Sequence, residues 1–423
     1  MIKRLWVDGY KSLKNLEINF SEGVTVFAGP NAAGKSNIID LIKLVAATAT
    51  KPIGEAFKDH RGDPIFAFDV RRIKQKSTKF SVEMDIRLSD ESIAAVEKRM
   101  GTYRVRKVVG WKRYLRYSLT IGFDRNTGKL AIQEEELYPL TKSGNKPNSS
   151  RYYIKTERGH RILKMEAQAR PKLFELGTDR TLLQEPLYVP HHPHVCALRE
   201  ELGRVAAYYF DPYSMRTETP IMEIDTLESS GTPLAAFINT MRYTDPEAFL
   251  HIQQDLAVFV EDITAIDIVR NPATDRLVLM LKEESGIPLP PTVISEGTLR
   301  FLGILALVYS PYKFTTLAIE EPENGVHTAR LEVLATIFKN AAESRGIQFI
   351  LTTHSPTLYR YFPLEGVQII KKRGGYTQVI SLVQALSSLG YKLDKRRARG
   401  VIGALLREDE TLAELIDAVV TQR

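Results

Sequence analysis

The first forty residues alternate between apolar and polar positions and then change to a helical repeat. Residues 1–10 and 16–20 alternate, which predicts two half-exposed strands. Residues 24–28 form an apolar run that stops at a Gly-Pro turn, as a buried strand does. From residue 36 onward, apolar residues recur at helical spacing. The pattern therefore predicts a strand, a glycine-containing loop and a helix, in that order.

Further along the chain, the pattern changes from strands to helices and back. Residues 80–88 alternate, and 115–123 and 129–137 flank a turn that predicts a hairpin. We expect an exposed polar loop at 141–151, mainly helical structure over 165–262, and a second hairpin made by 263–269 and 277–282. Apolar runs typical of parallel strands return at 316–320 and 349–353, each followed by helical sequence.

These elements predict an α/β protein whose core is split in the sequence. Residues 1–164 form the first lobe, with antiparallel strands, and residues 285–423 complete the core. Residues 165–284 are a mainly helical insertion with a hairpin, which we interpret as a lid.

Composition excludes several other classes of protein. The 423 residues are 43% hydrophobic, enough for about two to three lobes with a sizeable core. One cysteine permits neither an internal disulfide nor a cysteine-based zinc site, which is typical of a reducing compartment. The chain has neither an apolar run of roughly 18 residues nor a signal-peptide core, so we expect a cytoplasmic protein with no membrane partner. The net charge of +7 is too mild to indicate a nucleic-acid ligand by itself.

A complete phosphate-loop pattern lies between the predicted buried strand and the helix. The pattern G-x-x-x-x-G-K-[ST] is matched by Gly29, Pro30, Asn31, Ala32, Ala33, Gly34, Lys35 and Ser36, and Asn37 follows. Glycines allow successive N–H groups to face a phosphate, and the helix start adds the positive end of its dipole. Lys35 is expected to reach the β- and γ-phosphates and Ser36 to hold Mg²⁺. The alternative is a chance glycine turn.

Two carboxylates end the predicted strand at 316–320, and a histidine ends the next one. Glu320 is expected to hold Mg²⁺ or its water, and Glu321 to polarise the attacking water. His354 is expected to bond the γ-phosphate and so report its presence. The alternatives are solvated acids in a loop and a structural histidine. A nucleophilic triad is rejected because no strand–Ser–helix elbow accompanies these residues.

Ser295 and Gly297 begin a further apolar helix. A Ser-x-Gly at a helix start offers an anion a hydroxyl and free N–H groups. Within one subunit this second anion site has no evident partner. It is explained if it covers the γ-phosphate that a second subunit holds.

The order of these four motifs resembles the ABC-type ATPase heads, which include RecF, the SMC proteins and the OLD (overcoming lysogenization defect) family. It is most similar to the RecF/OLD-like bacterial ATPases that are often grouped as AAA-type proteins. The motif sequences typical of that group occur at residues 29–37, 295–300, 320–327 and 353–355. The resemblance covers about residues 1–90 and 285–370 well and the middle loosely.

The resemblance implies a P-loop NTPase of ABC-head type that uses ATP and Mg²⁺ to form a homodimer or higher oligomer, with Ser295 and Gly297 acting in trans. Three positions depart from the pattern. Glu320 stands where most ABC ATPases have Asp, although the OLD-like branch commonly uses Glu. Thr328 replaces a usual Pro beside the candidate His327, and the glutamine loop has only Gln75 as a candidate.

The resemblance also restricts the function. Long coiled-coil arms are missing, and the sequence after His354 is too short for the Toprim nuclease domain of OLD proteins. We therefore expect an ATPase that controls a separate effector, such as a nuclease or toxin, in antiphage defence or DNA repair. The alternative is an ATP-gated sensor or scaffold that holds a toxin or nuclease, with slow hydrolysis only as a reset.

A basic stretch with interleaved aromatic residues spans residues 98–117 and contains no acid. It suits a DNA or RNA backbone with stacking on exposed bases, and a solvated strand face is the equal alternative. The candidate contacts are Arg104, Arg106, Lys107, Lys112, Arg113 and Arg116. A second basic cluster at 395–399 is interpreted as a helix surface.

Two remaining patterns favour structural interpretations. His191, His192, His194 and Cys196 surround Pro193, which argues against a helix and predicts a proline-rich loop rather than a metal site. Helical spacing after residue 411 predicts a C-terminal helix, for ordinary packing or for docking a partner.

Overall fold

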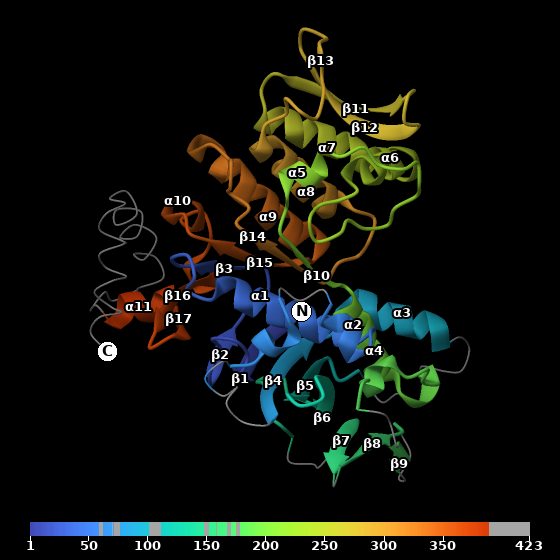
Figure 1. Cartoon of the computed structure of the whole chain (residues 1–423), viewed down its shortest axis with the longest axis vertical. Helices are drawn as coiled ribbons and strands as arrows, with labels where there is room; N and C mark the ends of the chain where they lie inside the picture. The colour runs from blue at the N-terminus through green and yellow to red at the C-terminus, as the bar shows by residue number, and fades with distance from the viewer. Residues whose placement is uncertain are drawn as a thin grey trace. The chain divides into compact units, whose positions relative to one another are not determined.

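The computed structural model describes residues 1–58, 62–69, 71, 77–100, 111–147, 152–157, 159–166, 171–174 and 178–388. The chain forms two compact units, each made from separate stretches of sequence (Figure 1). The first unit comprises Met1–Glu22, Gly29–Val205 and Gln368–Ser381, and the second comprises Gly23–Ala28, Ala206–Val367 and the residues from Leu382 onward. None of the helices in the described ranges combines the length and the apolar character needed to cross a membrane.

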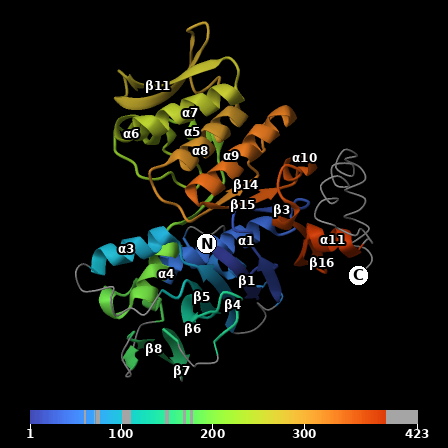
Figure 2. The same cartoon turned by 180° about the vertical axis from the view of Figure 1, so that it is seen from behind.

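An antiparallel sheet of eight strands dominates the first unit. Its strands are β1 (Ile2–Asp8), β2 (Leu16–Asn19), β4 (Ser77–Arg87), β5 (Tyr114–Asp124), β6 (Lys129–Pro139), β7 (Ile154–Glu157), β8 (His160–Lys164) and β9 (Pro171–Phe174). They lie in the order β2-β1-β4-β5-β6-β7-β8-β9, which can be followed in Figures 1 and 2. Alternate residues are buried in β2 and in the first part of β5, so one face of the sheet is apolar there and the other is polar.

Helices and an aromatic cluster complete the first unit. The other elements are α1 (Lys35–Thr48), α2 (Ile53–Ala56), α3 (Asp90–Met100), α4 (Pro193–Gly203), the 3₁₀ helices η1 (Pro64–Ala67), η3 (Leu182–Gln184) and η4 (Val189–His191), and the hairpin β16 (Val367–Arg373) with β17 (Tyr376–Ser381). Helix α1 packs against α2 and α4, and α2 contacts β6. Under the sheet, the Phe80 ring lies 5.1 Å from Tyr10 and 5.3 Å from Phe68, and all three side chains are buried. Such rings supply much of the apolar area that stabilises a core.

Three parallel strands form the centre of the second unit. They are β3 (Val24–Ala28), β14 (Thr316–Glu320) and β15 (Gln348–Thr353), and every residue in them is buried. β15 pairs with both β14 and β3. Burial on both faces explains why these strands are continuous apolar runs rather than alternating ones.

Helices cover this parallel sheet and carry a small antiparallel sheet. The remaining elements of the second unit are β10 (Val205–Tyr208), α5 (Pro212–Met215), α6 (Leu234–Thr244), α7 (Pro246–Phe259), β11 (Ile263–Asn271), β12 (Arg276–Glu283), β13 (Pro288–Leu289), α8 (Glu296–Tyr309), η5 (Thr328–Arg330), α9 (Leu331–Arg345), α10 (Pro356–Tyr359), η6 (Leu364–Gly366) and α11 (Leu382–Ser388). Helix α9 packs on β15 and β3, and α6, α7, α8 and α9 lie side by side in sequence order (Figures 1 and 2). The stacked rings of Phe259 and Phe301, 3.6 Å apart, join α7 to α8.

Most elements expected from the pattern are confirmed, including both hairpins, the helix after the phosphate loop and the parallel strands. The expected proline-rich loop at 191–196 is wrong, because α4 begins at Pro193. Proline fits the first helical turn, where its missing N–H costs nothing. No group of three or more potential metal ligands occurs among the described residues, and His194 instead bonds Glu166.

The compact units divide the chain differently from the predicted lobes. The first unit continues past residue 164 to Val205, because β9, η3, η4 and α4 belong to it. The basic cluster at 395–399, the helix after residue 411 and Gln75 lie outside the described residues.

Candidate functional site: a phosphate loop and the edge of a parallel sheet

The phosphate loop lies in the first unit and begins directly after β3. Two of its residues adopt left-handed backbone conformations, Ala32 at φ 61 and Gly34 at φ 108. The Lys35 Nζ donates to the carbonyl oxygens of Gly29 at 2.7 Å and Pro30 at 3.1 Å, which draws this buried lysine under the loop. Helix α1 starts at Lys35 with no capping side chain and no acid in its first turn. An uncapped helix start of this kind fits a phosphate group.

Two residues distant in sequence brace the phosphate loop. The hydroxyl of Thr377 in β17 donates to the carbonyl of Ala33 at 3.0 Å and lies 2.7 Å from the hydroxyl of Ser12. Asn37 in turn donates to Ser12 at 2.8 Å. A β-carbon at Gly34 would lie 2.0 Å from the Thr377 hydroxyl, so this position requires glycine for space as well as for φ. Sequence reasoning missed Ser12 and Thr377, because no motif spacing connects them.

In the second unit, the carboxyl ends of the three parallel strands are in register. Glu320 of β14 is opposite Thr352, and Thr353 of β15 is opposite Ala28 of β3. The next residues along the chain are the two principal candidates, Glu321 and His354, and the first loop residue, Gly29. Three segments that the sequence predicts to handle ATP therefore leave one edge of one sheet, where α/β proteins bind their ligands.

The loop after β14 turns sharply at Glu321. This residue has φ 45, in the left-handed region, and its N–H donates to the Thr352 carbonyl at 3.0 Å. Its Oε2 accepts a hydrogen bond from Asn324 at 2.8 Å, and its Oε1 lies 3.4 Å from the Nδ1 of His354. The structure thus brings the expected water-polarising carboxylate and the expected phosphate-sensing histidine together.

Glu323 lies in the same loop, and the motif pattern assigns it no role of its own. Its side chain is buried and accepts from the hydroxyl of Thr353. Burial raises the pKa of this carboxyl, and the hydrogen bond from Thr353 only partly offsets that effect. His327, the other candidate here, is exposed and accepts from the N–H of Ala329 at the start of η5.

The Ser-x-Gly motif begins α8 as expected. Ser295 is the N-cap, and its hydroxyl oxygen accepts from the N–H of Thr298 at 3.1 Å. The loop before it is fixed by Arg216, which donates to the carbonyls of Pro291 at 2.9 Å and Ile294 at 2.8 Å. Arg216 is a further residue that the motif pattern did not include, and it acts by fixing this loop.

Gly297 lies against the backbone of the loop after β14. A β-carbon there would be 2.0 Å from the carbonyl oxygen of Gly325, which itself has φ +78. Helix α8 and the loop that carries Glu321 are therefore in backbone contact, which any side chain at residue 297 would disturb. The expected meeting of Ser36 with Glu320 at Mg²⁺ involves one residue from each unit and stays a prediction.

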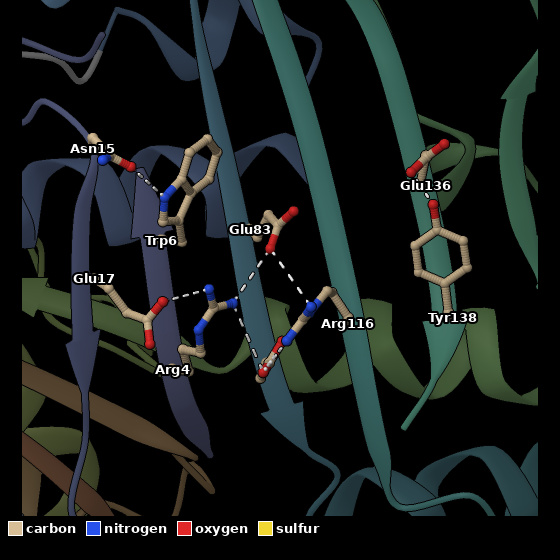
Figure 3. A network of polar contacts seen from close by, with 9 residues as sticks. Arg4, Trp6, Asn15, Glu17, Glu83, Arg116, Glu136 and Tyr138 are labelled. Atoms are coloured by element: carbon tan, nitrogen blue, oxygen red, sulfur yellow. Dashed lines mark hydrogen bonds and ion pairs between the residues drawn. The ribbon is translucent and has the colours of Figure 1, made fainter. Parts of the chain in front are cut away.

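Arg116 of the basic stretch is already paired with carboxylates on the polar face of the eight-stranded sheet (Figure 3). Arg116 bonds both oxygens of Asp85, at 2.6 and 2.7 Å, and lies 3.7 Å from Glu83. Arg4 joins the same network through Glu83 at 3.3 Å and Glu17 at 2.7 Å. The guanidinium of Arg4 lowers the pKa of Glu17 by hydrogen bonding.

Arg113 pairs with Asp90 at 2.6 Å, whereas Lys112 uses its backbone N–H to donate to His194. Arg104, Arg106 and Lys107 lie outside the described residues. Arg116 thus has a visible structural role, and the nucleic-acid assignment of the whole stretch stays a prediction.

Family models match most of the chain in two parts. A model described as an AAA domain matches residues 4–186, and one described as "AAA domain, putative AbiEii toxin, Type IV TA system" matches residues 175–360.

Curated relatives match over shorter stretches. The DNA replication and repair protein RecF of Thermoanaerobacter sp. (strain X514) is 33% identical over 67 residues, 16% of this chain and 17% of the relative. RecF of Clostridium botulinum (strain Eklund 17B / Type B) is 49% identical over 41 residues, 10% of this chain and 11% of the relative. The matched stretches thus span less than a fifth of the length of either relative, 17% of the first and 11% of the second.

A solved structure matches nearly the whole fold. It is an SMC head bound to the C-terminal winged-helix domain of ScpA, with a TM-score of 0.53 and 13% identity over 90% of this chain and 97% of that one. Fold and motifs together define an ABC-type ATPase head. The chain is similar to AAA domains in both of its parts and to RecF over a short stretch, and it has the fold of an SMC head, which confirms the resemblance read from its motifs.

Proposed function

We propose that this protein hydrolyses ATP with Mg²⁺ and that two copies close around the nucleotide, each completing the other's site. The observation that supports this most directly is the common register of β14, β15 and β3. This register brings the ends of β14 and β15, which are followed by Glu321 and His354, to one sheet edge, and phosphoryl transfer requires residues in such separate roles.

Each residue has a role that follows from its chemistry. Lys35 and the N–H groups of the loop hold the phosphates, and Glu321 orients the attacking water. His354 contacts the γ-phosphate, while Ser295 and Gly297 of a second copy cover it. Ser36 and Glu320 are the residues that would hold Mg²⁺, which supplies positive charge where the transferred phosphoryl group becomes more negative.

Phosphate release and particle size test the proposal together. Glu321→Gln should slow hydrolysis by roughly 10²–10⁴-fold, because the water loses its orienting base, and should trap an ATP-bound dimer. Glu343→Gln, on the exposed surface of α9, is the matched control and should leave turnover and size unchanged. Wild-type turnover in Glu321→Gln would exclude this mechanism. A particle that keeps its size with and without ATP would exclude nucleotide-driven dimerisation.

The proposed biological role is control of a separate effector, a toxin or nuclease, in antiphage defence or DNA repair. The description of the second matching family as a putative toxin of a Type IV TA system, together with the RecF relatives, supports this role. The same description favours a second candidate, an ATP-gated scaffold that holds a toxin and hydrolyses ATP only to reset. Co-purification of a partner that leaves only after hydrolysis supports the scaffold, and partner activity that scales with turnover supports the driven effector.

DNA is a further proposed partner, through the stretch at 98–117. Its affinity should fall steeply with salt, with a logarithmic slope near −0.9 per neutralised phosphate on duplex DNA. Charge reversal of Arg104, Arg106, Lys112 and Arg113 to Glu should abolish binding, as measured by fluorescence anisotropy. Unchanged affinity would refute this contact surface.

A further inference from the structure

Glu323 connects the loop after β14 to the end of β15. Its Oε1 accepts hydrogen bonds from the hydroxyl of Thr353 and from the backbone N–H of His354, the latter at 3.3 Å. The side chain is only 6% exposed, so water competes little for these bonds. The two donors are the last residue of a buried strand and the residue expected to sense the γ-phosphate.

This connection fixes the place of the His354 ring. The side chain of His354 is 44% exposed, so packing restrains it weakly. Its Nδ1 nevertheless lies 3.4 Å from Glu321 and 3.8 Å from Glu323. Because Glu323 accepts the hydrogen bond of the His354 N–H, the backbone of His354 is fixed at the point from which the side chain extends. The His354 ring then lies next to the Glu321 carboxylate.

The surroundings of Glu323 argue against a chemical role for it. Its Oε2 is buried and has no hydrogen-bond partner among the residues that the structure describes. A carboxyl in this position acts through the acceptor Oε1, which an amide oxygen can replace. Glu321, by contrast, must present a charged carboxylate to water. The two glutamates of one loop should therefore respond differently to the same substitution.

We propose that Glu323 is a positioning residue for ATP hydrolysis, holding Thr353 and His354 so that the histidine ring stays beside Glu321. The proposal rests on the proposed ATPase function. It extends that function by giving Glu323 a role in positioning His354, while Glu321 remains the residue that acts on water.

Substitutions at Glu323 and Thr353 test it by kinetics. Glu323→Ala should lower kcat roughly 10–100-fold, as expected for a misplaced catalytic group, and leave the affinity for ATP within about twofold. Glu323→Gln should restore kcat to within about threefold of wild type, since the amide oxygen accepts the same bonds. Thr353→Val should resemble Glu323→Ala, and Thr353→Ser, which keeps the hydroxyl, should resemble wild type. Wild-type kcat in Glu323→Ala would overturn the proposal, and so would equal losses in Glu323→Ala and Glu323→Gln.

Ring NMR signals provide a readout that does not depend on activity. The chain has 8 histidines, so the His354 signal can be assigned by its loss in His354→Asn. Glu323→Ala should shift or broaden that signal, whereas Glu323→Gln should not. If the wild type fails to hydrolyse ATP, the proposed function fails while this measurement still decides the geometry. A His354 signal unchanged in Glu323→Ala would refute the positioning role.

Discussion

Replacing Gly297 by alanine tests whether helix α8 and the loop after β14 form one rigid contact. A β-carbon at residue 297 would lie 2.0 Å from the oxygen and 2.6 Å from the carbon of the Gly325 carbonyl, whereas real contacts stay above 3.0 Å. Because the obstacle is backbone, no side-chain rotation relieves it. The loop has to retreat by about 1 Å.

The magnitude follows from two opposing effects on the free energy of unfolding. Alanine in place of glycine stabilises a helix interior by up to about 1 kcal/mol, whereas overpacking costs about 1–3 kcal/mol. Gly297 is in the first turn of α8, where the gain in helix propensity is small. We therefore expect a net loss of about 1–2 kcal/mol. The rate of ATP turnover should also fall, by about 100-fold, because the displaced loop carries Glu321.

Gly303→Ala on the same helix is the matched control. Its β-carbon would meet Met215 Cε at 2.8 Å and Phe210 Cε1 at 2.9 Å, both of them side-chain atoms. The methionine end moves at low cost, and the gain in helix propensity at this interior position offsets a small shift of the Phe210 ring. Stability should therefore change by less than about 1 kcal/mol, and turnover should stay near wild type because neither side chain belongs to the loop after β14. Urea unfolding measures the first quantity and phosphate release the second. If Gly297→Ala keeps the stability and turnover of the wild type, the loop after β14 moves away without cost and the contact is not rigid. If both variants lose stability and turnover equally, the loss comes from the packing of α8 in general and not from this contact.

Three further predictions concern positions outside this contact. Arg216→Ala should cost about 1–3 kcal/mol of unfolding free energy and weaken ATP-dependent dimerisation measured by light scattering, because the loop before Ser295 loses both bonds; unchanged dimerisation would contradict this. A double-mutant cycle of Arg116→Ala and Asp85→Ala should give a coupling of about 1–2 kcal/mol that shrinks with salt, and a coupling of zero would remove the pair's structural role. Burial raises the pKa of Glu135 above its ordinary 4.5, so its folded state binds the proton more tightly than the unfolded state does. The contribution of this carboxyl to the free energy of unfolding is fully present below pH 4.5 and is lost as the pH rises through the raised pKa. In urea unfolding at several pH values, Glu135→Gln should abolish this decline of stability with pH. A decline parallel to that of the wild type would refute the prediction.

The sequence predicted those parts of the fold whose information is local. The apolar runs at 24–28, 316–320 and 349–353 had to be buried strands, because continuous hydrophobicity of that length suits a sheet covered on both faces. The conformations of the phosphate-loop glycines and of the Ser295 cap are likewise determined by a few neighbouring residues. These elements position most of the candidate site.

Contacts between distant segments could not be predicted in this way. Ser12 and Thr377 meet beside the phosphate loop although nothing in their own surroundings marks them. Pro193 was misjudged because a proline in a run of histidines indicates a loop unless the helix begins at the proline itself. In each case the deciding fact is which segment packs next to the residue, and that belongs to the tertiary structure.

Three glutamates near the end of β14 show how the fold, rather than residue type, assigns chemistry. Glu320 ends the strand and is buried with it, and Glu323 points back into the protein toward Thr353. Glu321 alone turns outward, and it does so through a left-handed backbone, which an L-residue adopts at a cost of about 1–2 kcal/mol. That strain persists because its N–H lies within hydrogen-bonding distance of both the carbonyl and the hydroxyl oxygen of Thr352, at 3.0 and 3.2 Å. The neighbouring strand therefore holds in place the one acid of the three that must face water.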